Sequence, residues 1–184
     1  MNLMSAESSV LVLVDYQARL MPVIADGLAV ASTALLLGRA ARLLDIPVLG
    51  TEQNPAGLGP NVDEIRAVCA STLPKMHFDA CADGLAEVIE NARRGCGQVV
   101  IAGCEAHVCM LQTALGLLRA GKRVWVVENA SGSRRPSDDH ATAMRRLAQA
   151  GATVVTHEMV LFEWLNNCRH PRFKEVLALL KAKK

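Results

Sequence analysis

The chain has 184 residues, the length of one domain that can bury a full core. It carries 20 Lys and Arg against 18 Asp and Glu, a net charge of +2, with the two signs mixed along the sequence. Proteins that bind nucleic acid usually carry a basic stripe. The one Tyr, two Trp and three Phe residues are too few and too scattered to stack bases. Composition therefore argues against a nucleic-acid partner.

The sequence also argues against membrane insertion and export. Its purest apolar run, residues 10–14, is far shorter than the roughly 20 residues that span a bilayer. The first nine residues contain no Lys or Arg and no apolar segment, so no secretory signal is expected. The six cysteines include no C-x-x-C pair, which is typical of free thiols in a reducing compartment. We expect a cytoplasmic protein without a membrane partner.

Six short β-type runs alternate with longer helical stretches. The first run, SVLVLVD, is typical of a strand buried on both faces. Apolar residues at helical spacing predict a covering helix over residues 28–45, and glycines end three later helices. Ser137, which two aspartates follow, is expected to cap a helix. The expected strands cover residues 9–15, 46–51, 98–103, 123–127 and 152–156, with one more ending near Lys75.

Strands that alternate with helices predict β-α-β units and a mostly parallel sheet, here as a single α/β domain over residues 1–184. The only long irregular segment expected is residues 51–61. Near the C-terminus, residues 160–164 and 176–180 are strongly apolar. Two interpretations stay open: these residues pack within the chain, or they are buried against another copy in a homo-oligomer.

The carboxyl ends of the predicted strands carry the residues that could do chemistry. In open parallel sheets, ligands bind at this edge, where the strand order reverses. Asp15 ends the first strand, Lys75 ends the third, and Cys109 follows the fourth. A carboxylate, an ammonium and a thiol would thus meet at one rim, although each taken singly also has an ordinary structural explanation.

Cys109 is the candidate nucleophile. It begins the helix that runs to about Gly121, so unpaired N–H groups and the helix dipole would surround its sulfur. Together with Lys75, this position predicts a lowered pKa for the thiol and makes Cys109 the most reactive cysteine. Asp15 could take the thiol proton and return it to a leaving group.

These residues resemble a known family. Asp15 followed by Gln17, Lys75 ahead of Phe78, and the segment from Gly103 to Cys109 resemble the isochorismatase-like cysteine hydrolases, which include nicotinamidases and N-carbamoylsarcosine amidases. The segments TEQNPAGLG, GCEAHVC and HPRFKE resemble in particular the branch of small isochorismatase domain-containing proteins.

The resemblance implies a three-layer α-β-α fold whose six-stranded sheet has the order 3-2-1-4-5-6. It also implies that Asp15, Lys75 and Cys109 form a catalytic triad. The backbone N–H groups of Glu105 and Cys109 would form the oxyanion hole, next to a cis peptide bond between Cys104 and Glu105. Gln53, Phe78, Glu105 and His107 are the candidate substrate-binding residues.

No cofactor is expected. Metal-dependent nicotinamidases carry an Asp-x-His pair after the second strand, where this chain has Glu52-Gln53-Asn54. The cluster around His107 lacks the ligand spacing of a zinc site, and Gly57-Leu58-Gly59 is not a dinucleotide fingerprint. The Arg134-Arg135 pair could bind an acidic group, but a solvated loop explains it better.

The sequence therefore predicts a metal-independent cysteine hydrolase that cleaves C–N (amide) bonds of a small molecule through a thioester. Two alternatives stay open. One is a catalytically silent binding or scaffolding protein of the same fold, and the other is a redox-responsive thiol protein.

Overall fold

The computed structural model describes residues 3–182 and contains one six-stranded sheet. Its order is β3-β2-β1-β4-β5-β6, and every neighbouring pair is parallel, as the resemblance implies. The order reverses between β1 and β4, so this is the switch point where ligands bind in such sheets. The strands are β1 (Ser9–Val14), β2 (Val48–Gln53), β3 (Ser71–Lys75), β4 (Gln98–Gly103), β5 (Arg123–Val127) and β6 (Thr153–Val155).

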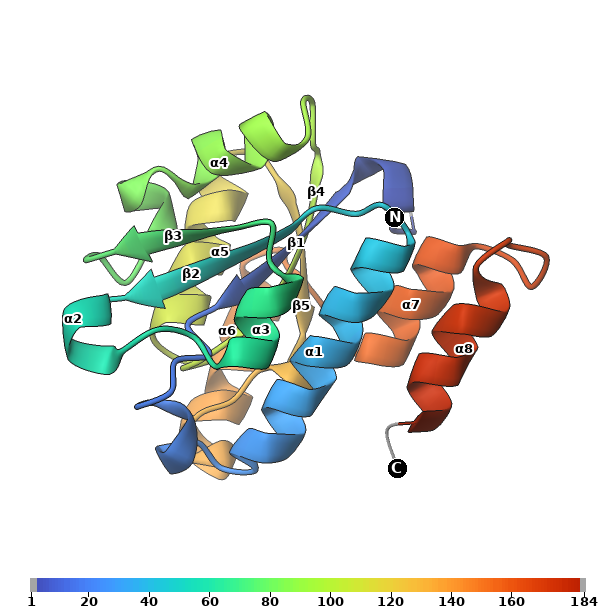
Figure 1. Ribbon diagram of the computed structural model, residues 1–184. Coiled ribbons are helices and arrows are strands. Elements are labelled where there is room, and N and C mark those ends of the chain that lie inside the picture. The colour runs from blue at the N-terminus through green and yellow to red at the C-terminus, as the bar shows by residue number, and fades with distance from the viewer. Residues whose placement is uncertain (1–2, 183–184) are drawn as a thin grey trace.

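Helices cover both faces of the sheet (Figure 1). One layer consists of α1 (Gly27–Leu43), α3 (Asp63–Val68), α7 (His157–Leu165) and α8 (Phe173–Ala182). The other consists of α4 (Leu85–Ala92), α5 (Cys109–Arg119) and α6 (Ala141–Gln149). Shorter turns join these elements: η1 (Ala6–Ser8), η2 (Met21–Val23), α2 (Pro55–Leu58), η3 (Ala80–Asp83), η4 (Glu128–Ala130) and the π-helical η5 (Pro136–His140).

The central strand β1 shows why the sheet needs two helical layers. Leu11 and Leu13 point into the core under α1, whereas Val10, Val12 and Val14 point into the core under α5. Successive side chains of a strand alternate between faces, so an all-apolar strand is buried only if both faces are covered. The three-layer fold follows from this composition.

The apolar C-terminal residues pack within the chain. Val160, Leu161, Trp164 and Val176 are at most 2% exposed and belong to the core beneath α1. The Trp164 indole N–H donates to the Ser9 hydroxyl at 3.1 Å. These four residues therefore pack within the chain, whereas Phe162 in the same stretch is 45% exposed.

Strand β2 ends two residues later than expected, because its last residues pair with β3. In the parallel register Glu52 lies beside Pro74, and Gln53 lies beside Lys75. Gln53 is therefore a strand residue held next to Lys75, and the expected irregular segment contains the helical turn α2. Ser137 lies within η5, where its hydroxyl faces the Asp138 carboxylate at 3.5 Å, so the expected cap is wrong.

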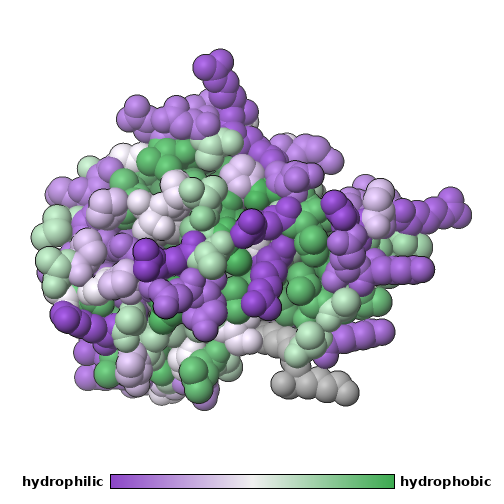
Figure 2. Space-filling model, viewed as in Figure 1, coloured by the Kyte–Doolittle hydropathy of each residue, from purple (hydrophilic) through white to green (hydrophobic). Residues whose placement is uncertain are grey.

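On the face shown in Figure 2, hydrophilic side chains are interspersed with exposed apolar surface. Among the described residues, no helix combines the length and apolarity that crossing a bilayer requires.

Candidate functional site

Asp15 directly follows β1, at the switch point of the sheet. Its backbone has a φ of 54°, so the chain turns sharply as the strand ends. The Thr51 hydroxyl donates to Asp15 Oδ1 at 2.6 Å, and the Asp15 N–H donates to the Thr51 carbonyl at 3.2 Å. Strand β2 therefore fixes both the backbone and one carboxylate oxygen of Asp15.

Lys75 forms an ion pair with the other carboxylate oxygen of Asp15. Its Nζ lies 2.8 Å from Asp15 Oδ2, and both side chains are 0% exposed. The ammonium also donates to Gln53 Oε1 at 2.7 Å and lies 3.4 Å and 3.5 Å from the carbonyl oxygens of His77 and Phe78. A buried ion pair with this many acceptors meets the condition under which such pairs persist in a core.

Cys109 is the first residue of α5 and is 6% exposed. Its Sγ lies 3.8 Å from Gln53 Oε1, and the Asp15 carboxylate and the Lys75 ammonium are near enough to shift the pKa of the thiol. The structure therefore brings together Asp15, Lys75, Cys109 and Gln53, which come from four different segments of the chain.

The pKa of the Cys109 thiol is raised. Burial raises its pKa to about 12, and the neighbouring Asp15 carboxylate acts in the same direction. Lys75 lowers the pKa, as expected from the sequence, but its effect is smaller than that of burial. The expected lowering of the thiol pKa is therefore wrong, because removing a thiolate from water outweighs one nearby ammonium.

Several backbone N–H groups around Cys109 have no hydrogen-bond acceptor among the described residues. The Cys104–Glu105 peptide bond is cis, as the resemblance implies. Ala106 donates to the Gly132 carbonyl, and both Val108 and Met110 donate to the Glu105 carbonyl. Within the described residues, the N–H groups of Glu105 and Cys109 have no protein acceptor, and no side chain caps α5. Both donors are available to a ligand at the helix N-terminus.

The Glu105 side chain is paired with Arg134. Its Oε2 accepts from the Arg134 backbone N–H at 3.0 Å and from Arg134 Nε at 3.1 Å. The carboxylate is 8% exposed, whereas the arginine is 61% exposed. Arg134 thus ties the 131–135 loop to one carboxylate oxygen of Glu105.

The remaining candidate substrate residues lie at the edges. His107 Nδ1 lies 2.9 Å from the Ser133 hydroxyl, and Nε2 lies 3.7 Å from Asp139 Oδ2. Its ring lines a groove of about 380 Å³ between α5 and α6. Phe78 is half exposed, and its carbonyl oxygen lies 3.5 Å from the Lys75 Nζ. Among the described residues, no group of three or more His, Cys, Asp or Glu side chains could hold a metal ion.

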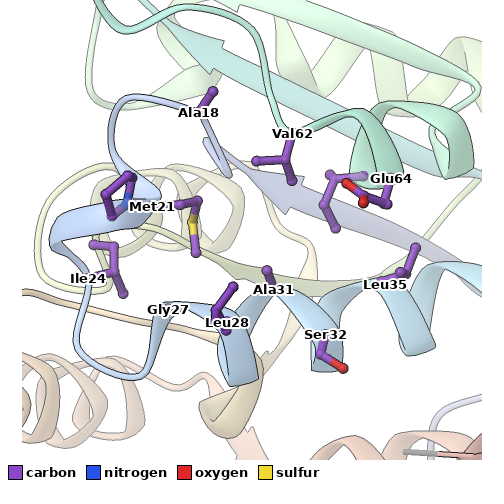
Figure 3. A pocket seen from close by; sticks show the side chains of 12 residues that line it. Ala18, Met21, Ile24, Gly27, Leu28, Ala31, Ser32, Leu35, Val62 and Glu64 are labelled. Atoms are coloured by element: carbon purple, nitrogen blue, oxygen red, sulfur yellow. The ribbon is translucent and has the colours of Figure 1, made fainter.

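An apolar groove of about 710 Å³ lies between η2, α1 and α3 (Figure 3) and contains none of the predicted site residues. Its lining includes Met21, Ile24, Leu28, Ala31 and Val62, which Figure 3 labels. The groove and the Asp15–Lys75 pair are thus separate features of the molecule.

Sequence reasoning assigned no role to two residues that hold the site. Thr51 holds Asp15, and its place opposite Val14 in the sheet register was the only signal. Gln17, two residues after Asp15, is fully buried. Its amide accepts from the Gln53 N–H at 2.9 Å and donates to the Gln53 carbonyl at 2.9 Å. Both contacts join segments far apart in the sequence, so spacing alone could not reveal them.

The chain is similar to known proteins over most of its length. The family model described as Isochorismatase domain matches residues 9–159. The chain is 37% identical over 175 residues to isochorismatase domain-containing protein 2A of Mus musculus, covering 95% of this chain and 84% of that protein.

Solved structures share the fold. One is described as MAR1 ribonuclease from Caenorhabditis elegans, with 33% identity and a TM-score of 0.90 over 98% of this chain and 93% of that one. Another is the YcaC gene product of Escherichia coli, described as an octameric hydrolase of unknown specificity. It has 24% identity and a TM-score of 0.85 over 100% of this chain and 98% of that one.

Proposed function

The chain belongs to the isochorismatase family, and from that premise we propose that it is a metal-independent cysteine hydrolase acting on the C–N (amide) bond of a small molecule. The observation that carries the proposal is the buried Asp15–Lys75 pair beside Cys109, at a helix N-terminus with two unpaired N–H groups. A nucleophile, a base and oxyanion donors are the three parts that acyl transfer requires.

Asp15 is the general base in this mechanism. Its carboxylate takes the Cys109 thiol proton as the sulfur attacks the amide carbonyl, which forms the C–S bond. The same proton passes to the leaving nitrogen as the C–N bond breaks, and a thioester remains. Water then attacks the thioester, Asp15 takes a proton from it, and the proton returns to the sulfur as the acid leaves.

The resting state explains why the base is needed. Because the pKa of the thiol is raised to about 12, little thiolate exists near neutral pH. Proton transfer to Asp15 therefore accompanies attack, and Lys75 stabilises the negative charge that develops on sulfur. The N–H groups of Glu105 and Cys109 would hold the oxyanion that forms at the carbonyl oxygen.

Mass spectrometry with a library of small amides and esters tests the proposal directly. We expect an acyl adduct on Cys109 and a burst of the first product, both lost in Cys109→Ala. Phe78 and His107 would contact the substrate, so Phe78→Ala should raise KM. Turnover that survives Cys109→Ala would refute the mechanism, and the absence of any adduct or turnover would favour the silent scaffold.

A redox-responsive thiol has less support. Peroxide attacks exposed cysteines of low pKa, whereas Cys109 is 6% exposed and its pKa is raised. Peroxide titration that left Cys109 unmodified while amide turnover continued would separate the two functions.

RNA cleavage is a second candidate, because the C. elegans relative is described as a ribonuclease. The near-neutral charge and few aromatic residues favour a small molecule over RNA. An assay with labelled RNA, run with Cys109→Ala as control, checks this: we expect no cleavage that depends on Cys109.

We also propose that residues 1–184 act as one cytoplasmic domain and that copies of the chain associate into a homo-oligomer. The molar mass of the purified protein, measured by light scattering, tests association.

A further inference from the structure

The side-chain amide of Gln53 lies between Lys75 and Cys109, in an orientation that its partners determine. Lys75 can only donate, so the atom 2.7 Å from Nζ must be the oxygen. The Met76 carbonyl can only accept, so the atom 2.8 Å from it must be the nitrogen. The assignment of Oε1 and Nε2, often ambiguous in proteins, is therefore settled by chemistry.

This amide has little left to offer a substrate. An amide oxygen has two lone pairs, and here they face the Lys75 ammonium and the Cys109 thiol. One of the two N–H groups of Nε2 donates to the Met76 carbonyl, and Gln53 is 8% exposed. A substrate contact would have to use the single remaining N–H.

Gln53 Oε1 makes two contacts, and the one with the Lys75 ammonium is the stronger. It is short and one partner is charged, and such hydrogen bonds are roughly twice as strong as neutral ones. The contact with sulfur is 3.8 Å long, and a thiol is a weak donor. The amide therefore acts mainly by holding the ammonium and only secondarily by accepting from the thiol.

The backbone of Gln53 is also held in place, by hydrogen bonds to the Gln17 side chain. The Gln17 amide bonds both the N–H and the carbonyl of Gln53 and also donates to the Gly59 carbonyl at 2.6 Å. Buried polar groups with all their partners in place restrict a side chain to one position. The end of β2 is thus a rigid support for the Gln53 amide.

We infer that Gln53 is a positioning residue, which holds the Lys75 ammonium beside the Cys109 sulfur, rather than a substrate contact as the sequence suggests. The inference rests on the proposed function of Cys109 as nucleophile. Among the residues that the structure describes, Lys75 has no other short hydrogen bond to a neutral acceptor, since the carbonyls of His77 and Phe78 lie 3.4 Å and 3.5 Å away. Without Gln53, the ammonium would keep only Asp15 and these two longer contacts.

The test measures alkylation of Cys109 in the full-length protein, which needs no substrate. Gln53→Met keeps the length of the side chain but removes both hydrogen-bonding groups. Gln112→Met is the matched control, because Gln112 lies on the exposed face of α5, one turn from Cys109. Rates of Cys109 modification by iodoacetamide and by N-ethylmaleimide at pH 9 are followed by peptide mass spectrometry.

We expect Gln53→Met to slow both reagents by the same factor, at least fivefold, and Gln112→Met to leave both rates unchanged. An equal factor for two reagents of different size indicates a smaller thiolate fraction rather than altered access. A rate equal to that of the unmodified protein, a faster rate, or factors that differ between the reagents would overturn the inference.

A second variant covers the case in which Gln53→Met does not fold. Gln53→Asn keeps the amide but shortens the side chain by one methylene, which draws its oxygen away from the Lys75 ammonium, so alkylation should slow for both reagents by the same factor. An unchanged rate would contradict the inference. The acyl-adduct experiment fails or succeeds independently of these rates, so a wrong function and a wrong role for Gln53 are distinguishable.

Discussion

Replacing Lys75 with Met tests whether the buried ion pair holds the site together. The change leaves the Asp15 carboxylate fully buried, with the Thr51 hydroxyl as its remaining side-chain partner. Breaking one side of a buried pair costs about 3–5 kcal/mol. For a chain of this size that corresponds to a fall of roughly 6 to 20 °C in Tm.

Removing the other partner of the pair, Asp15, should lower the free energy of unfolding by less. Asp15→Asn leaves the Lys75 ammonium with the Gln53 amide oxygen and two carbonyl oxygens. The loss is then one charged hydrogen bond, about 1.5–3 kcal/mol. The double variant, Asp15→Asn with Lys75→Met, contains no buried charge at this point, so it should be more stable than Lys75→Met alone.

Urea unfolding of the four proteins, followed by circular dichroism and extrapolated to water, supplies the free energies of unfolding. The prediction is the order of stability: unmodified protein, then Asp15→Asn, then Lys75→Met, with the double variant above Lys75→Met. If the two single changes simply add in the double variant, the two groups are not coupled and the reasoning fails.

Three further predictions concern the site and its supports. Below its raised pKa of about 12, Cys109 should be alkylated about tenfold faster for each unit of pH between 7 and 10; a plateau near neutral pH would show a resting thiolate instead. Gly103→Ala should destabilise the protein by about 3 kcal/mol in thermal unfolding, because the new Cβ would lie 2.9 Å from the Val14 Cα, which cannot move without parting β1 from β4. Gly97→Ala, with no atom within 4 Å of its Cβ, is the matched control and should unfold near the original temperature. Dialysis against EDTA should leave the activity on any substrate found intact, and recovery upon adding zinc would show that a metal-binding residue was overlooked.

The strands and the two-layered cover of the sheet could be predicted from local patterns. Leu11, Val12 and Leu13 form an apolar run that only a strand covered on both faces can bury, and the Gly121 turn marks where a helix ends. Because parallel strands end at one edge, the same reasoning placed Asp15, Lys75 and Cys109 at a common rim. The strand order and the role of each group came from resemblance to a family.

What the tertiary structure alone decided is the electrostatics of the site. Sequence indicates that Lys75 and a helix terminus lie near Cys109, but not how much water remains there, and burial reverses the expected direction of the thiol pKa. Likewise, Gln53 reads as a loop residue until the β2–β3 register sets it beside Lys75. Local sequence determines which segments are strands and helices, whereas desolvation and pairing depend on atoms from segments that meet only after folding.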